Sequence, residues 1–174
     1  MLSKFSIVLS ILLQISLVYK AFPQKVDLTK LKGMSIRNIG PSGMSGRVTA
    51  IDVDKVNHKI YVGTASGGLW LSDNGGISWK PIFDEQPTLS IGCVKVNPKN
   101  PLEIWVGTGE GNPRNSHNAG YGIFKSMDGG KTWNNMGLQQ TRLIHRVLID
   151  FDHPNTVYVG ALGSAWGPSK EKGV

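Results

Sequence analysis

One phrase recurs three times in this chain and restricts the folds open to it: an apolar residue, an aromatic residue, valine, glycine and a small residue. The copies lie at 59–66, 103–109 and 156–163. An alternating apolar segment and a polar turn precede each copy, which is typical of two half-buried strands joined in a hairpin. A third strand, 68–72 or 122–126, follows the first two copies, and a fourth opens at Trp79 or Trp133. The repeat therefore predicts four short antiparallel strands about every 50 residues.

No segment after the first twenty residues keeps a helical period for longer than two turns, so the predicted class is all-β. A four-stranded unit of this period fits the blade of a β-propeller, because such a sheet buries its faces only when neighbours stack on it. We expect a partial propeller: a lead-in at 22–46, complete blades at 47–88 and 89–142, and an incomplete third blade at 143–174. Closed propellers use about 4 to 8 blades. We therefore expect the remaining blades of the same propeller to be partners of this chain.

The turn between the third and fourth strands carries the most specific motif, Ser-x-Asp/Asn-x-Gly-x-Ser/Thr-Trp. Its residues are Ser72, Asp73, Asn74, Gly76, Ser78 and Trp79 in one copy, and Ser126, Asp128, Gly130, Thr132 and Trp133 in the other. The short polar side chain of such a turn accepts hydrogen bonds from its own main chain, glycine admits positive φ, and the hydroxyl caps the returning strand. We therefore interpret these residues as scaffold, and Asp128 as a structural residue in preference to a metal ligand or catalyst.

These turns resemble the Asp-box, or BNR, repeat of sialidases, sortilin-type domains and xyloglucanase-type glycoside hydrolases. Segments 38–54, 62–70 and 161–168 also look like the opening blades of exported bacterial proteins of the sortilin-N-terminal or BNR-repeat glycosyl-hydrolase-like type. The resemblance runs from about Gly33 to Val174. It implies a large secreted or cell-envelope propeller, with the boxes on the face opposite the active site.

The loops between second and third strands should lie at the end of the sheets opposite the Asp-box turns. The middle loop, 108–122, is longer than a turn requires and gathers polar side chains, as binding loops on rigid scaffolds do. The candidate ligand-facing residues are Arg47, Glu110, Asn112, Arg114, Asn115, His117 and Trp166. The alternatives are that 108–122 is a solvated insertion and that the Trp166 indole only packs against its own loop.

Glycoside hydrolysis needs two carboxylates beside the scissile bond. The resemblance to xyloglucanase-type enzymes implies a catalytic Asp just before the Gly67-Gly68 pair, but 64–66 is Thr-Ala-Ser. A sialidase implies an arginine cluster, which Arg47 alone does not supply, and Glu110 is the one acidic side chain in these loops before the third blade. We therefore predict no catalytic residue and a non-catalytic scaffold that binds protein or polysaccharide. The alternative is the N-terminal part of a glycoside hydrolase whose carboxylates lie beyond Val174.

Composition argues against several other classes of protein. The net charge is +7, but the basic residues are scattered singly, whereas a nucleic-acid binder clusters them. A single cysteine, Cys93, excludes an internal disulfide and is interpreted as a small buried hydrophobe. The histidines lack metal-ligand spacing and are interpreted as surface or turn residues: His58, His117, His145 and His153. We expect no metal, cofactor or nucleic-acid partner.

The N-terminus differs in kind from the rest. Lys4 precedes an apolar run, 5–18, that is too short for a bilayer span of ~20 residues but suits a secretory signal. We predict a signal peptide at 1–21 and an exported protein, secreted, periplasmic or in the cell envelope. Tyr19 makes the cleavage site after Ala21 poor. An uncleaved anchor is the alternative, and would be the only membrane contact.

Overall fold

The computed structural model describes residues 27, 29, 47–112 and 115–174. The chain divides into two units, Met1–Arg37 and Asn38–Val174. In the first, the carboxylate of Asp27 accepts hydrogen bonds from the main-chain nitrogen and the hydroxyl of Thr29. The expected signal segment lies outside the described residues, as does nearly all of the lead-in. Among the described residues, no helix has both the length and the apolar character to cross a membrane.

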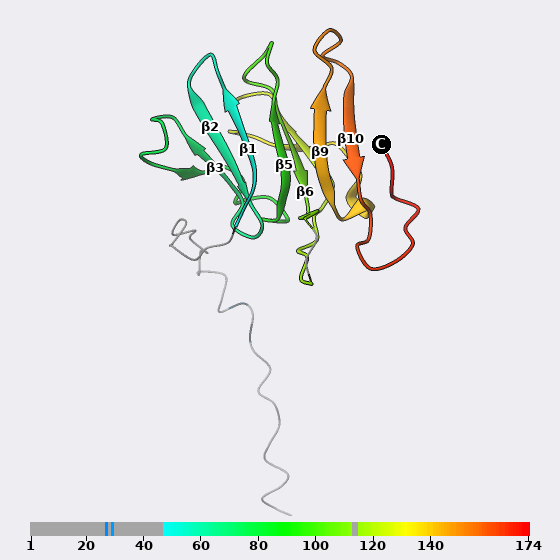
Figure 1. The fold of residues 1–174 in the computed structure, drawn as a ribbon. Coiled ribbons are helices and arrows are strands. Elements are labelled where there is room, and N and C mark those ends of the chain that lie inside the picture. The colour runs from blue at the N-terminus through cyan, green and yellow to red at the C-terminus, as the bar shows by residue number, and fades with distance from the viewer. Residues whose placement is uncertain (1–26, 28, 30–46, 113–114) are drawn as a thin grey trace, which may run out of the picture. The chain divides into compact units, whose positions relative to one another are not determined.

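The second unit is built from three antiparallel sheets, which confirms the predicted all-β class (Figure 1). The first sheet contains β1 (Val48–Asp54), β2 (Lys59–Thr64), β3 (Leu69–Ser72) and β4 (Lys80–Pro81). The second contains β5 (Ile91–Val96), β6 (Ile104–Thr108), β7 (Ile123–Ser126) and β8 (Asn134–Asn135). The third contains β9 (Ile144–Ile149) and β10 (Val157–Ala161), and a 3-10 turn, η2 (Gln139–Thr141), precedes it.

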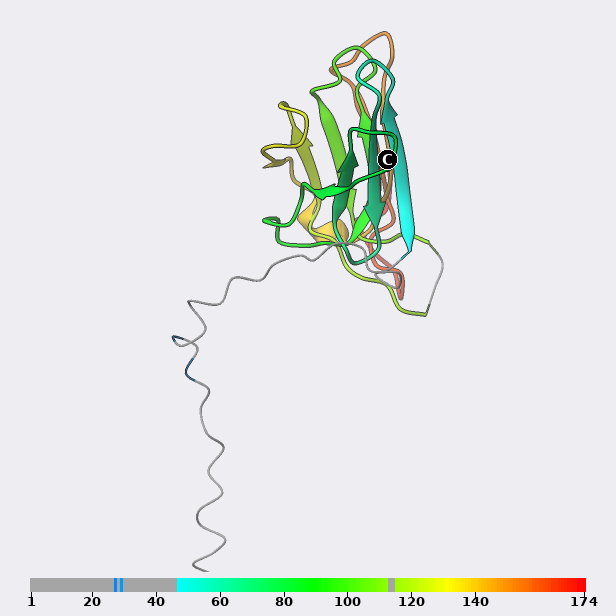
Figure 2. The same cartoon turned by 90° about the vertical axis from the view of Figure 1, so that its left-hand side faces the viewer.

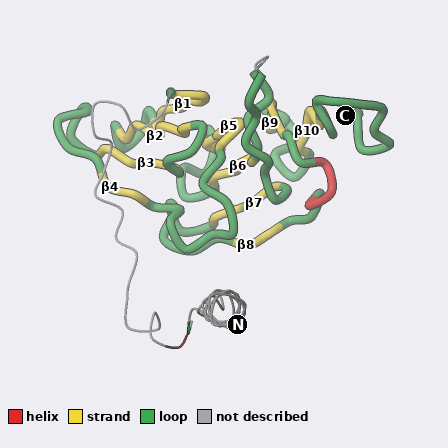
Figure 3. The backbone as a smooth tube through the Cα atoms, turned by 90° about the horizontal axis from the view of Figure 1, so that it is seen from below, coloured by secondary structure: helices red, strands yellow, loops and turns green. Residues whose placement is uncertain are grey.

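Strand order follows chain order in the first two sheets, and the third is a hairpin. Figures 2 and 3 show β1, β5 and β9 along one edge of the unit, and the outer strands β4 and β8 along the opposite edge. The outer strands begin one residue after the tryptophans at which we expected them. Each is only two residues long, because the chain turns away toward the next sheet.

Two apolar clusters hold the sheets face to face. The cluster between the first and second sheets contains Tyr61, Leu69, Leu71, Phe83, Ile91, Val94, Val96, Ile104, Val106 and Phe124. The cluster between the second and third contains Cys93, Trp105, Ile123, Ile144 and Val147. Apolar residues alternate along the inner strands, so the middle sheet supplies one face to each cluster and the first and third sheets supply one face to one cluster each.

The glycine of the repeated phrase is where neighbouring sheets approach most closely. A Cβ at Gly63 would overlap the side chain of Ile91, and a Cβ at Gly107 would overlap that of Ile144. Both isoleucines begin the first strand of the next sheet. The repeat thus encodes a groove over glycine that receives a β-branched side chain from the neighbouring blade.

The two Asp-box turns are closed by their own side chains. Asp128 Oδ1 accepts hydrogen bonds from the main-chain nitrogens of Lys131 and Thr132, both at 2.9 Å, and Oδ2 accepts from the Thr132 hydroxyl at 2.6 Å. In the other turn, Asn74 Oδ1 accepts from the Ser78 nitrogen at 2.9 Å, and Asp73 instead pairs with a lysine. Asn74 therefore fills the role that Asp128 has in its own turn.

Asp128→Ala is expected to lower the free energy of unfolding by about 1 kcal/mol, as loss of a capping side chain does, and Asp128→Asn by less. The Thr132 hydroxyl and main-chain donors hold the pKa of Asp128 well below its usual range. A carboxyl with a depressed native pKa stabilises above its unfolded pKa and loses that effect as pH falls through the native pKa. Urea unfolding at pH 7 and below pH 4 should show the alanine penalty shrinking with acid, with Lys131→Ala as control. A penalty that is absent or independent of pH would contradict this role.

Candidate functional site

The loops of all three sheets converge at one end of the unit, which we call the loop end and define as 65–68, 82–90, 109–112, 115–122, 136–143 and 162–172. Main-chain and amide hydrogen bonds hold it together. Gly68 donates to the carbonyl of Leu89 at 2.9 Å, and Gly120 donates to that of Arg142 at 2.6 Å. The amide of Asn118 donates to the carbonyl of Ala65 at 3.2 Å. Loops from different sheets therefore form one continuous surface, below the strands in Figure 1.

An ion pair with a buried carboxylate anchors the loop end. Arg47 lies just before β1 and Glu110 just after β6, and a guanidinium nitrogen donates to a carboxylate oxygen between them. Glu110 is only 1 % exposed, whereas the arginine is partly accessible. The second carboxylate oxygen of Glu110 is buried and accepts no hydrogen bond in the described structure. Two predicted site residues thus meet across the first two sheets, as a structural clamp rather than an open binding group.

The long loop between β6 and β7 folds back on the same end. The His117 ring nitrogen Nε2 lies 2.6 Å from the carbonyl oxygen of Asn112. Asn112 is half-buried and Asn115 is exposed. Arg114 lies outside the described residues.

An exposed tryptophan stands beside this loop. Trp166 is 71 % exposed, and its ring centroid lies 5.8 Å from that of His117 at an interplanar angle of 41°. The two rings border a hollow of about 70 Å³. Its other lining residues are Ala119, Arg142, Leu143, Gly163, Ser164 and Ala165. An indole here offers a flat apolar face next to polar groups, which suits a sugar ring.

Two residues of the loop end, Asp84 and Arg142, were not among the predicted site residues, and the prediction for nearby His145 was wrong. Asp84 is exposed, and its carboxylate lies beside Gly68, so Glu110 is joined by a second acidic side chain at this end. Arg142 lines the hollow with a φ of 61°. His145 is half-buried in β9 rather than a surface or turn residue, and burial, with the nearby Arg146 charge, lowers its pKa. Asp84 approaches Gly68 and Arg142 lines the hollow only through packing of loops, which no local sequence pattern marks.

The Thr64–Gly68 loop, where the resemblance implies a catalytic Asp, is instead closed by hydrogen bonds among its own residues. The Thr64 hydroxyl donates to the carbonyl of Gly68 at 3.0 Å and accepts from the nitrogen of Gly67 at 2.8 Å. Ala65 is buried beside it. Among the described residues, no three His, Cys, Asp or Glu side chains gather as metal ligands would. The exposed indole and polar loop groups described at this end can stack on a ligand and hydrogen-bond to it.

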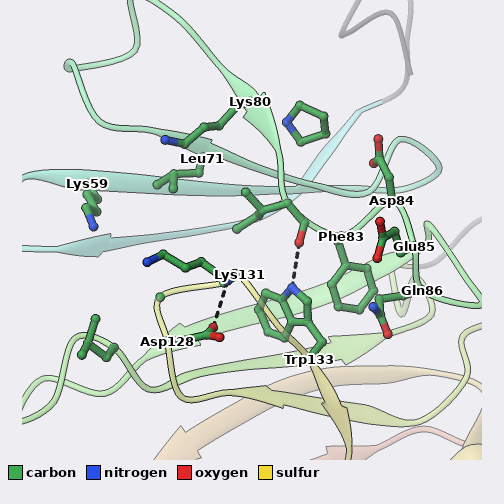
Figure 4. Close-up of a pocket in the computed structure, with 15 residues that line it drawn as sticks. Lys59, Leu71, Lys80, Phe83, Asp84, Glu85, Gln86, Asp128, Lys131 and Trp133 are labelled. Atoms are coloured by element: carbon green, nitrogen blue, oxygen red, sulfur yellow. Dashed lines mark hydrogen bonds between the residues drawn. The ribbon is translucent and has the colours of Figure 1, made fainter. Parts of the chain in front are cut away.

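A second hollow, of about 560 Å³, lies between the outer parts of the first and second sheets (Figure 4). Lys59, Lys80 and Lys131 line one side, and Asp84 and Glu85 line the other. Trp133 of the second Asp-box holds one wall, because its indole nitrogen donates a hydrogen bond to the carbonyl of Ile82 at 2.7 Å. This hollow reaches from the second Asp-box turn to the edge of the loop end.

Solved structures of similar architecture are GH74 enzymes. An ancestral GH74 enzyme is 30% identical with a TM-score of 0.55, covering 66% of this chain and 16% of its own. The GH74 enzyme of Niastella koreensis is 24% identical with a TM-score of 0.51, covering 67% and 17%. The GH74 xyloglucanase of Xanthomonas campestris is 17% identical with a TM-score of 0.43, covering 56% and 16%. The matched region thus spans about a sixth of each of these structures.

No protein-family model matches this chain, and no curated protein matches it. The structural likeness confirms the predicted partial β-propeller, and it marks the chain as glycosyl-hydrolase-like in architecture. It does not single out the BNR or sortilin type within that architecture.

Proposed function

We propose that this chain is part of a β-propeller that binds a polysaccharide at the loop end without cleaving it. The observation that carries the proposal is the exposed indole of Trp166 beside His117, over a hollow where loops of all three sheets meet. Flat aromatic faces bordered by polar groups are typical of ligand sites on rigid scaffolds. The likeness to GH74 enzymes favours a polysaccharide over a protein ligand.

The disposition of carboxylates supports a non-catalytic role. Glycoside hydrolases place two carboxyl groups about 5 to 9.5 Å apart around the bond. Glu110 is buried and clamped by Arg47, and the loop before Gly68 has no acidic residue. Asp84 is exposed beside that loop, with exposed Glu85 next to it in the connection to the second sheet. Neither Glu110 nor the loop before Gly68 therefore supplies the acid or base that hydrolysis requires.

We also propose that the protein is exported to the cell envelope, periplasm or medium, and that other blades of the same propeller are its partners. The apolar run at 5–18 behind Lys4 supports export. The repeated blade pattern supports the partners, because propeller sheets bury their faces against one another.

A second candidate function, part of a glycoside hydrolase, is favoured by the 30% identity to a GH74 enzyme. In that case the catalytic carboxylates come from other blades. The two candidates differ in product: the hydrolase releases new reducing ends from a polysaccharide, and the binding scaffold does not.

Trp166→Ala is expected to weaken polysaccharide binding by about tenfold or more, because truncating a central aromatic anchor costs about 2 kcal/mol or more. Affinity electrophoresis in gels containing xyloglucan, mixed-linkage β-glucan or galactomannan measures this retardation. Phe151→Ala is the matched control, since Phe151 is also an exposed aromatic residue but lies in the β9–β10 turn.

Retardation by a polysaccharide that is lost in Trp166→Ala, kept in Phe151→Ala and accompanied by no new reducing ends supports the binding scaffold. Release of reducing ends by this chain favours the hydrolase. Binding that is insensitive to Trp166, or absent with all three polysaccharides, contradicts the proposed site.

A further inference from the structure

The contacts between the first and second sheets are repeated between the second and third. The equivalent face of the third sheet should therefore bury the same kinds of side chain. The aromatic residue of the repeated phrase is Tyr61 in β2 and Trp105 in β6, with exposures of 0% and 9%. Both face the next sheet, beside the groove over Gly63 or Gly107 that receives an isoleucine. Burial of this aromatic residue therefore indicates that another sheet covers that face.

The third sheet shows the same face uncovered. Its aromatic residue, Tyr158, is 49% exposed, and its cross-strand partner Leu148 is exposed as well. A Cβ at Gly160 would meet only Arg146 of the same sheet, at 3.4 Å and beyond. The groove that holds an isoleucine in the two other sheets is thus open.

One position of this face departs from the repeat. Opposite the glycine, the first strand carries Ala50 in the first sheet and Cys93 in the second, but Arg146 in the third. The Arg146 guanidinium donates to the main-chain oxygen of His145 at 3.2 Å. In the described part of the chain it forms no ion pair with a carboxylate. A covering surface that buried this charge without a partner would be strongly disfavoured.

We propose that the third sheet is covered by a further four-stranded propeller sheet of defined chemistry. The first strand of that sheet places an aliphatic side chain in the groove over Gly160 and a carboxylate against Arg146. The aliphatic requirement follows from Ile91 and Ile144, which fill the equivalent grooves. The acidic requirement follows from the replacement of a small residue by arginine at the paired position.

A second copy of this chain meets only half of these requirements. Its β1 would offer exposed aliphatic side chains, Val48, Ile51 and Val53. Both carboxylates of β1 are already committed: Asp52 accepts from the nitrogen of Val96 at 2.8 Å, and buried Asp54 closes its own turn. A copy docked here would bury Arg146 without a counter-charge. The observations therefore favour a different sheet that carries an acidic residue.

The test uses the full chain in the cells that make it, with the photo-crosslinking amino acid p-benzoylphenylalanine at position 158. The same group at position 151, an exposed aromatic site in the turn of that hairpin, is the matched control. Mass spectrometry then sequences the peptide joined to position 158. We expect an alternating aliphatic strand that contains Asp or Glu, and no such peptide from position 151.

Arg146→Glu is expected to lower the crosslink yield about tenfold or more, because like charges would then face each other, and changing the partner's acidic residue to Arg should restore it. Gly160→Val fills the groove and should lower the yield too, while circular dichroism shows that both variants remain folded. A crosslinked peptide from 48–62 of another copy, a peptide without this pattern, no crosslink, or a yield insensitive to Arg146→Glu would each overturn the proposal.

Discussion

Replacing Gly109 by alanine is expected to lower the free energy of unfolding by about 3 to 5 kcal/mol, the sum of a strained backbone and overpacking. Gly109 has a φ of +86°, and a Cβ there would collide with the carbonyl of Arg142 and approach the nitrogen of Gly120. Both are main-chain atoms, so no side-chain rotation relieves the clash. The junction between the second and third sheets would have to open.

Urea unfolding followed by tryptophan fluorescence measures this loss. Gly75→Ala is the matched control, because Gly75 also has a positive φ, +70°, but a Cβ there meets open space. The control should lose only about 1 to 2 kcal/mol from the left-handed backbone conformation. Equal losses in the two variants would show that the loop does not pack as described.

Arg47→Met is expected to lower the free energy of unfolding by about 3 to 5 kcal/mol, because it leaves the carboxylate of Glu110 buried without its counter-charge. Glu110 is 1 % exposed, and its second oxygen already lacks a hydrogen bond in the described structure. Removing both charges with Arg47→Met and Glu110→Leu should recover most of the loss, since an apolar pair of similar size tolerates burial.

The control for this cycle is the exposed pair of Lys80 and Asp73, whose atoms lie 2.9 Å apart. Lys80→Met should leave the unfolding midpoint unchanged, because exposed ion pairs contribute little. An Arg47→Met variant as stable as the parent, or a double variant no more stable than Arg47→Met, would contradict the buried clamp.

Much of the fold could be predicted because the repeat ties local pattern to packing. The apolar residues of β5 pack in both clusters and those of β9 in one, and the phrase glycines Gly63 and Gly107 mark where the neighbouring strand enters. These features depend on residues close in sequence. The short outer strands were placed one residue early, because tryptophan belongs to the turn and not to the pairing.

The candidate site was harder to predict, because its residues meet only through tertiary packing. Arg47 and Glu110 were both expected among the ligand-facing residues, but their pairing joins positions 63 residues apart and has no local signal. The contact between His117 and Trp166 likewise links two sheets. The sequence pattern marks loops within a blade, whereas Asp84 lies in the connection between the first two sheets.

The central claim of this account is that one end of the sheets recognises a ligand and the other end is scaffold. The most direct measurement is a two-dimensional ¹H–¹⁵N NMR titration of the chain with the polysaccharide fragment that it binds best. We expect shifts concentrated at 65–68, 115–122 and 163–166, with the turns at 72–79 and 126–133 unchanged. Shifts concentrated in those two turns, with the loop end silent, would contradict the account.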